Sequence, residues 1–255
     1  MRLPTLNILR CPICGGTLTL DAQKVEEGDV VEGKLSCVSC GRAYAVSGGI
    51  PDFVVEQCLR GENRLQRLFY NLYAPLYDGL ERRLAELLGF SEEELRSEVV
   101  SRMEIGRGDS VLEVCVGTGG NIPYFRRYTD GLVAGLDISE GMLSVCRSRA
   151  RREGWGDVEL FLGCAEFLPF KDEAFDRVLI GGAISHFSDP GRALAEAARV
   201  TKKEGKVVVY EQVTLLEKVM GRDRPSLDLL PPSLTLLGVT YLLGGRFYVV
   251  ELLRR

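Results

Sequence analysis

The spacing of apolar positions divides the chain into three parts, and the longest of them begins near residue 109. From there on, short apolar runs alternate with segments of helical periodicity. We expect five strands in this part, at 110–116, 133–137, 158–162, 177–180 and 206–212. We expect the intervening helices to run to about 127, over 140–152 and over 192–200. Strands that alternate with helices predict an α/β fold, in which a mostly parallel sheet is covered on both faces.

The end of the chain has a different pattern. Two strand-like runs, 239–243 and 246–252, are separated by Gly244 and Gly245, and such spacing predicts an antiparallel hairpin closed by a two-residue turn. The apolar stretch 227–243 before this turn is expected to hold the last helix and its strand. The closing hairpin therefore adds an antiparallel edge to the sheet.

Residues 56–104 have the periodicity of helices. Leucines recur there three or four residues apart, at Leu65, Leu68, Leu72, Leu76, Leu80, Leu84, Leu87 and Leu88. Pro75 lacks the N–H that a helix interior requires, so it should interrupt or begin one of these helices. This segment is expected to connect the first part of the chain to the long last part and to act as a lid.

The first 54 residues carry four cysteines in the pattern C-x2-C-x22-C-x2-C. Two cysteines that are two residues apart can present both sulfurs to one tetrahedral ion, so Cys11, Cys14, Cys37 and Cys40 predict a zinc site. Short strand-like stretches at 17–20, 30–35 and 43–46 complete the layout of a zinc ribbon. We therefore expect three domains: a zinc ribbon (1–54), a helical connector and lid (55–104), and an α/β core (105–255).

The zinc site is expected to be structural. Four thiolates close the tetrahedron and leave no position for water or substrate, and a module with so little core needs its metal to fold. Disulfides are the alternative, but the first residues carry no secretory signal, which also indicates a cytoplasmic protein.

Composition excludes several classes of function. The chain has 255 residues and a formal net charge of −4, which argues against binding nucleic acid by bulk electrostatics. It has no uninterrupted apolar run of about 18 residues, so a membrane span is not expected. The chain contains eight cysteines but one histidine. The oligomeric state stays open.

Candidate chemistry lies at the ends of the first two strands of the core. The strand that begins at Val111 runs into a glycine-rich turn, which lets a ligand approach bare backbone. Asp137, about twenty residues on, ends the second strand, where a carboxylate can accept hydrogen bonds from both hydroxyls of a ribose. A dinucleotide fingerprint starting at Gly117 would need glycine at position 122, which is Ile122. The pattern thus predicts a nucleoside-like ligand that is not a dinucleotide.

These residues resemble the motifs of class I S-adenosylmethionine-dependent methyltransferases. Residues 111–120 resemble the first motif, hydrophobic-Leu-acid-x-Gly-x-Gly-Thr-Gly, and the similarity extends over about 105–212. Residues 136–142 resemble the ribose motif, and 163–170 with 175–176 resemble the adenine-side motif. Residues 70–78 resemble the lid helix of quinone-biosynthesis C-methyltransferases. Together these resemblances imply a Rossmann-like methyltransferase fold and S-adenosyl-L-methionine as cofactor.

The resemblance also implies roles for individual residues. Glu113 would sense the amino group of the cofactor, Gly117 and Gly119 would admit its methionine part, and Asp137 would bind the ribose. Ile138 and Met142 would lie against the adenine, Ala165 and Glu166 would line its edge, and Tyr77 would cover the site.

Two cysteines depart from the family's pattern. Cys115 replaces the first glycine of the first motif, and Cys164 stands where the family has an aspartate for the adenine amino group. Cysteine is a poor acceptor, so Glu166 or a backbone carbonyl would have to serve the adenine. We expect both cysteines to be small buried apolar side chains, the alternative being a degenerate cofactor site that binds weakly.

The lone histidine is a candidate base. His186 follows the fourth strand of the core, where the family's substrates lie, and Glu211 at the end of the fifth strand is a second candidate. The alternative for His186 is a structural imidazole that caps the helix starting near residue 188.

The sequence favours a methyltransferase that acts on a small, apolar or quinone-like molecule. An RNA methyltransferase acting on bases of ribosomal or transfer RNA is a second hypothesis, because zinc ribbons also precede such catalytic domains. The end of the ribbon, residues 40–52, also resembles small zinc-ribbon proteins that activate separate methyltransferases. A non-catalytic adaptor with a degenerate cofactor site is therefore the third hypothesis.

Overall fold

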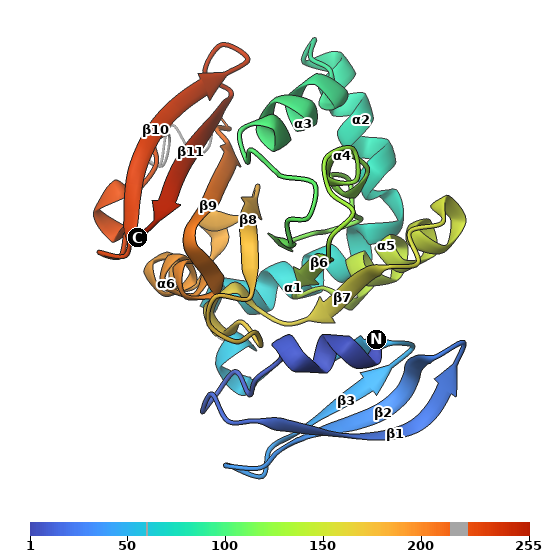
Figure 1. The fold of residues 1–255 in the computed structure, drawn as a ribbon. Coiled ribbons are helices and arrows are strands. Elements are labelled where there is room, and N and C mark those ends of the chain that lie inside the picture. Colours follow the sequence, from blue (N-terminus) through green and yellow to red (C-terminus); the bar gives the residue numbers. More distant parts are fainter. Residues whose placement is uncertain (60, 215–223) are drawn as a thin grey trace.

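A seven-stranded sheet forms the centre of the protein, with the strand order β10-β11-β9-β8-β5-β6-β7 (Figure 1). The computed structural model describes residues 1–59, 61–214 and 224–255. Strands β7, β6, β5, β8 and β9 run parallel, whereas β11 pairs antiparallel with both β9 and β10. The strands are β5 (Val111–Val114), β6 (Val133–Asp137), β7 (Val158–Leu162), β8 (Phe175–Gly181), β9 (Thr201–Gln212), β10 (Leu234–Leu242) and β11 (Phe247–Arg254). The expected Rossmann-like sheet with an antiparallel edge is confirmed.

The parallel strands are apolar on both sides because both faces of the sheet are covered. One face packs on α3 (Glu92–Ser101), α4 (Ile122–Phe125) and α5 (Glu140–Glu153). The other face packs on α6 (Pro190–Val200) and on the N-terminal module. Local residues set the helix ends: the Ser139 hydroxyl accepts from the N–H of Met142 at the start of α5, and Gly154 ends that helix with a positive φ.

Several predicted elements differ from the structure, among them the following three. Helix α4 ends at Phe125 instead of near residue 127, and the stretch expected to hold the last helix has only the short 3-10 helix η6 (Leu227–Leu229) before β10. The hairpin loop has four residues, because Leu242 pairs with Phe247. Leu243 takes a positive φ with the two glycines, so the turn is wider than the glycine pair alone predicts.

The N-terminal module is a four-stranded antiparallel sheet that lies against the core. It comprises η1 (Leu3–Ile8), β1 (Leu18–Glu26), β2 (Asp29–Cys37), β3 (Ala43–Ser47) and β4 (Ile50–Pro51). Just after β4, the N–H of Phe53 donates to the carbonyl of Leu162 in β7, at 2.7 Å, and Leu9 bridges to Phe170. The module therefore covers β7, the edge strand of the large sheet, as the lower part of Figure 1 shows.

An ion pair at the start of the chain strengthens this junction. The guanidinium of Arg2 contacts the buried carboxylate of Glu159 in β7 at 2.8 Å, and the hydroxyl of Thr5 donates to the same oxygen. Phe53 is fully buried in one apolar cluster with Phe161 and Phe170. The module and the core therefore share a single hydrophobic core.

The helical connector crosses from the module to the sheet. It consists of η2 (Glu56–Leu59), α1 (Gly61–Tyr73), η3 (Ala74–Leu76), α2 (Tyr77–Leu87) and then α3. The short 3-10 helix η3 contains Pro75, which confirms the predicted interruption. The leucines of α1 and α2 are exposed to solvent instead of forming a core.

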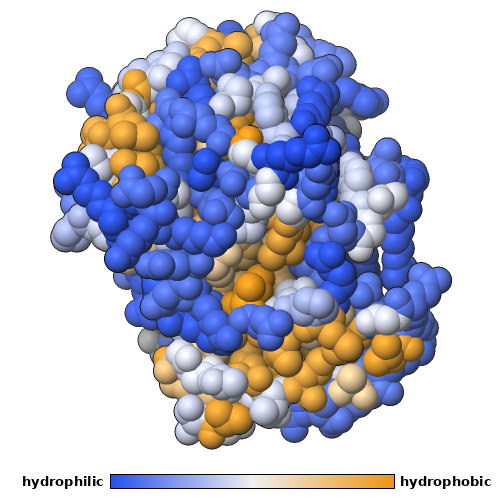
Figure 2. Space-filling view, in the orientation of Figure 1, coloured by the Kyte–Doolittle hydropathy of each residue, from blue (hydrophilic) through white to orange (hydrophobic). Residues whose placement is uncertain are grey.

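The surface has other apolar groups besides those of α1 and α2. In Figure 2, apolar side chains gather over the lower part of the molecule, where the N-terminal module lies, and at the upper left. The exposed apolar side chains of β10 are Leu236, Leu237 and Tyr241. Within the described ranges, no helix combines the length and the apolar character that crossing a membrane requires.

Candidate functional site

The turn after β5 folds sharply at the carboxyl end of the sheet. Cys115, Gly117 and Gly119 all take positive φ values, of 64°, 53° and 81°. A side chain built on Gly117 would meet nothing within 4 Å, whereas one on Gly119 would meet the sulfur of Cys146 at 2.7 Å. Gly117 therefore leaves the backbone open to a ligand, and Gly119 allows close packing against α5. Cys115 occupies a left-handed conformation in which a side chain costs about 1–2 kcal/mol.

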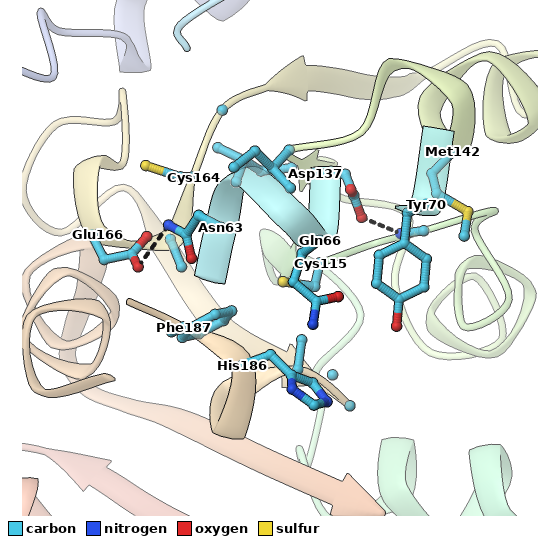
Figure 3. A pocket seen from close by; sticks show the side chains of 18 of the residues that line it. Asn63, Gln66, Tyr70, Cys115, Asp137, Met142, Cys164, Glu166, His186 and Phe187 are labelled. Carbon is cyan, nitrogen blue, oxygen red and sulfur yellow. Dashed lines mark hydrogen bonds between the residues drawn. The ribbon is translucent and has the colours of Figure 1, made fainter. Parts of the chain in front are cut away.

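This turn borders a pocket between the sheet edge and helix α1 (Figure 3). The pocket is lined from four directions: by α1 and α2, by the turn after β5, by the ends of β6 and β7, and by the segment after β8. The lining residues are Asn63, Gln66, Tyr70, Tyr77, Cys115, Gly117, Leu136, Asp137, Ile138, Met142, Gly163, Cys164, Ala165, Glu166, Gly181, Gly182, Ala183, His186 and Phe187.

Asp137 joins the two loops that frame the pocket. One carboxylate oxygen accepts the N–H of Gly117 at 2.8 Å, and the other accepts the N–H of Ser139 at 2.9 Å. Burial raises the pKa of Asp137 to about 6, and these N–H donors act in the opposite direction. Each oxygen keeps a second lone pair, so the carboxylate can still accept a hydroxyl from a ligand in the pocket.

Glu166 lies on the opposite side of the pocket, where Figure 3 shows it facing Asn63 of α1. One of its oxygens accepts from the Asn63 carboxamide at 2.9 Å and from the N–H of Ser188 at 3.1 Å. The other oxygen, Oε2, is buried without a hydrogen-bond partner among the described residues. A buried acceptor without a partner costs free energy, so this atom fits a ligand that brings an N–H group.

Cys164, next to this carboxylate, forms a disulfide with Cys58. Cys164 is buried in the apolar core as expected, but the sequence does not predict its disulfide. Cys58 belongs to η2, immediately before α1, so the bond ties the foot of α1 to the loop after β7. Cys115 is a free thiol that is partly exposed to the pocket.

Glu113 lies below the pocket and is not part of its lining. Its Oε1 accepts from the side-chain amide of Asn121 at 2.6 Å, and the Asn121 carbonyl accepts from Arg96 at 3.1 Å. Burial raises the pKa of Glu113 to about 8, while Asn121 and the charge of Arg96 lower it. Its Oε2 has no hydrogen-bond partner among the described residues.

His186 lines the pocket from η5 (Ile184–His186), at the lower end of the view in Figure 3. Asp189 caps the following helix α6, because its carboxylate accepts the N–H of Arg192 at 2.9 Å. The capping role considered for the imidazole therefore belongs to Asp189. Glu211 is buried outside the pocket lining and accepts the N–H of Ser185 at 3.1 Å, so it holds the backbone beside His186.

Helix α1 supplies pocket residues that the motifs do not indicate. Asn63 and Gln66 lie on the inner face of α1 and line the pocket, next to Tyr70, the first residue of the lid motif. Asn71 accepts from the hydroxyl of Ser139 at 2.7 Å, which fixes α1 against the start of α5. The sequence feature that could have identified these residues is the polar face of α1, which lies opposite its leucines.

The four cysteines of the N-terminal module converge. The sulfurs of Cys11, Cys14, Cys37 and Cys40 all lie within 4.8 Å of one another. A tetrahedral zinc ion with bonds of about 2.3 Å places its sulfurs a little under 4 Å apart, and the Cys11–Cys40 and Cys14–Cys37 distances are 3.8 and 3.4 Å. The donor set and its spacing fit zinc.

Known protein families match both the N-terminal module and the α/β core of this chain. Residues 112–209 match the family described as "Methyltransferase domain", and residues 2–49 match the family described as "Trm112p-like protein". A demethylmenaquinone methyltransferase of Geobacillus kaustophilus is 35% identical over 153 residues, which are 59% of this chain and 63% of that protein. The match thus spans less than two thirds of the relative's length.

Two solved structures share the fold. The [4+2]-cyclase SpnF has a TM-score of 0.59 at 16% identity, covering 74% of this chain and 95% of its own. The geranyl diphosphate C-methyltransferase of Streptomyces coelicolor has a TM-score of 0.52 at 16% identity, covering 64% and 79%. One is named a cyclase and the other a methyltransferase, so the fold alone does not assign a reaction.

Proposed function

We propose that this chain methylates a small apolar acceptor of the quinone type. It would do so with a class I S-adenosylmethionine-dependent methyltransferase domain that is related to the menaquinone methyltransferases and follows a Trm112-like four-cysteine module. The observation that carries the proposal is the pocket at the ends of β5 and β6, which gathers the residues of three methyltransferase motifs under α1. The relatives' name supports the acceptor class.

The pocket residues fit S-adenosylmethionine. Asp137 would accept the ribose hydroxyls, and the open backbone at Gly117 leaves room beside it. Ile138, Met142 and Ala165 would lie around the adenine. The free Oε2 of Glu166 would accept a hydrogen bond from the exocyclic amine of the adenine. Glu166 would thus replace the aspartate whose position Cys164 occupies.

The methionine end of the cofactor would extend toward Gly181 and the Glu113 layer. A Cβ atom built on Gly181 would lie 3.0 Å from the ring of Tyr210 and 3.5 Å from Oε1 of Glu113. Because Gly181 lines the pocket, Glu113 lies directly beneath the pocket floor. Its free buried oxygen, Oε2, would accept a hydrogen bond from the cofactor's ammonium group. Cys115 and Gly119 would shape the turn, and Tyr77 would cover the site from α2.

Bound S-adenosylmethionine supplies an electrophilic methyl group on a positively charged sulfur. Since the displacement is in line, the protein's main tasks are to position the acceptor and to exclude water. His186 would take the proton from an acceptor that must lose one, and Glu211 would hold the His186 segment through Ser185.

We also propose that Cys11, Cys14, Cys37 and Cys40 hold a structural zinc ion and that the module acts within this chain. Trm112-like similarity supports the adaptor hypothesis, but one side of the module is buried against this chain's own β7 and Phe170. A module whose apolar side is already covered is poorly suited to bind a second methyltransferase.

The test uses S-adenosylmethionine with a radioactive methyl group and three acceptors: a short-chain demethylmenaquinol, ribosomal RNA and transfer RNA. Label transferred to the quinol alone supports the proposal. Transfer to RNA alone would assign the protein to the RNA methyltransferases. A titration calorimetry experiment that shows no heat with millimolar S-adenosylhomocysteine would instead favour the adaptor hypothesis.

A further inference from the structure

Helix α1 has its amphipathic character reversed. In a helix on a soluble protein, the apolar stripe normally faces the core and the polar residues face water. Here the inward-facing side chains are polar, and Asn63, Gln66 and Tyr70 line the pocket. The outward stripe is apolar and repeats at helical spacing, at Leu65, Leu68, Phe69, Leu72 and Leu76.

The stripe continues along α2 as Leu80, Leu84 and Leu87. These eight side chains, which we call the leucine face, are 41–83% exposed. The other exposed apolar side chains of the described ranges occur in smaller groups, such as Leu236 and Leu237 on β10. A group of exposed apolar side chains of this size marks a surface that is covered by something else.

Unpaired positive charges border the leucine face. Arg64 and Arg83 are exposed, and neither of them contacts an acidic side chain in the described part of the chain. The nearby acids are largely engaged: Asp78 accepts from the hydroxyl of Thr118, and Glu81 is half-buried in the cavity beneath α2. Glu86 is the exposed acid that remains on α2.

Aromatic side chains lie at the boundary between this face and the pocket. The rings of Phe69 and Tyr73 stack at 5.3 Å, and Tyr73 meets the ring of Tyr77 edge to face at 5.7 Å. Tyrosine rings with one apolar and one polar end suit the boundary between hydrocarbon and lipid headgroups.

From these observations we propose that the leucine face docks on an anionic lipid membrane, with its leucines among the acyl chains and its arginines at the headgroups. An amphipathic helix that lies in the membrane interface combines leucine and phenylalanine with basic residues in this way. A second copy of the chain fits less well, because a two-fold contact would bring the unpaired arginines of both copies together. This inference does not depend on the identity of the methyl acceptor.

Co-sedimentation of the full chain with vesicles tests the proposal. Vesicles of phosphatidylglycerol and phosphatidylcholine in equal parts should bind the protein, and vesicles of phosphatidylcholine alone should bind it more weakly. Leu68→Gln with Leu72→Gln should lower the partition coefficient at least tenfold. Arg64→Gln with Arg83→Gln should lower it about 25-fold on the anionic vesicles only, at about fivefold per arginine.

A matched control alters exposed apolar residues elsewhere. Val25→Gln with Val38→Gln changes the N-terminal module and should leave vesicle binding unchanged. Far-ultraviolet circular dichroism shows whether each variant is folded, and the arginine pair keeps the test informative if the leucine variant is not. The assay contains no methyl acceptor, so its result is independent of the proposed reaction.

Two results would overturn the proposal. One is a wild-type protein that stays in the supernatant with both kinds of vesicle. The other is a dimer in sedimentation velocity that becomes a monomer in the Leu68→Gln, Leu72→Gln variant, which would assign the leucine face to contact between copies of the chain.

Discussion

Cys58 and Cys164 lie 106 residues apart in the chain, and their disulfide joins the foot of α1 to the loop after β7. A hydrogen bond between Asn63 and Glu166 crosses the same gap at 2.9 Å. The covalent and the polar cross-link therefore connect the same two segments on one side of the pocket. They keep α1 against the site even though its outer face is not packed.

The disulfide should contribute to stability. Closing a loop of about 100 residues stabilises the folded state by up to about 4.7 kcal/mol in the chain-entropy account. We expect Cys58→Ser to lower the melting temperature by about 10 °C, as measured by differential scanning fluorimetry. A reducing agent should lower the melting temperature of the wild type similarly and have no effect on the variant. Equal responses of both proteins would contradict the cross-link.

Asp137 should dominate ribose recognition. Replacing it with alanine removes a charged hydrogen-bond acceptor, which costs about 1.5–3 kcal/mol or roughly 10–100-fold in affinity. Calorimetric titration with S-adenosylhomocysteine measures this loss. Asp130→Ala is the control, since Asp130 forms an exposed ion pair with Arg107 away from the pocket. Equal affinities of the two variants would remove Asp137 from the site.

Glu113 should make stability depend on pH. Its pKa is raised to about 8 by burial, so the folded state holds a proton that the unfolded state loses above about pH 4.5. The free energy of unfolding should therefore be highest near pH 4.5 and decline as the pH rises to 8, at up to about 1.4 kcal/mol per pH unit.

Urea unfolding of the apo protein between pH 5 and 9 measures this decline. Glu113→Gln should flatten the curve between pH 6 and 8, because glutamine has no proton to lose. Asp137, whose pKa is raised to about 6, accounts for a slope that ends near pH 6 and persists in the variant. An unchanged slope between pH 6 and 8 would show that Glu113 is ionised in the folded protein.

The four-cysteine cluster should hold one zinc ion per chain. Cys14→Ser removes one ligand, so elemental analysis should find less than one equivalent and the melting temperature should fall. The buried free thiol Cys146 provides the control, since Cys146→Ser should keep the full zinc content. A full equivalent of zinc in the Cys14→Ser variant would place the metal elsewhere.

His186 should affect the reaction through its proton. If it acts as the base, His186→Ala lowers the turnover number and changes the dependence of turnover on pH. Binding of S-adenosylhomocysteine should change little, which separates catalysis from folding. Unchanged turnover between pH 6 and 9 would discard the role.

The parallel strands could be predicted because their residues are apolar on both faces. β6 and β7 begin and end where the pattern places them, at Val133–Asp137 and Val158–Leu162. Helix α5, expected over 140–152, spans Glu140–Glu153, because Ser139 caps its start and Gly154 ends it. Sequence reasoning succeeded here because neighbouring residues decide these boundaries.

Contacts between distant residues could not be predicted in this way. No local pattern pairs Cys58 with Cys164, and spacing alone did not show that the leucines of α1 face outward. Helical periodicity identifies an apolar stripe, but only the packing of Asn63 against Glu166 shows which side of the helix meets the protein.

The contact between the N-terminal module and β7 affects how the molecule is assembled during synthesis. Residues 1–54 leave the ribosome more than a hundred residues before β7 and Phe170, against which they pack. Until then Phe53 and Leu9 lack their partners, so the nascent module depends on its small sheet and on its thiolates. The proposed zinc ion would therefore contribute most to the module before the rest of the protein exists.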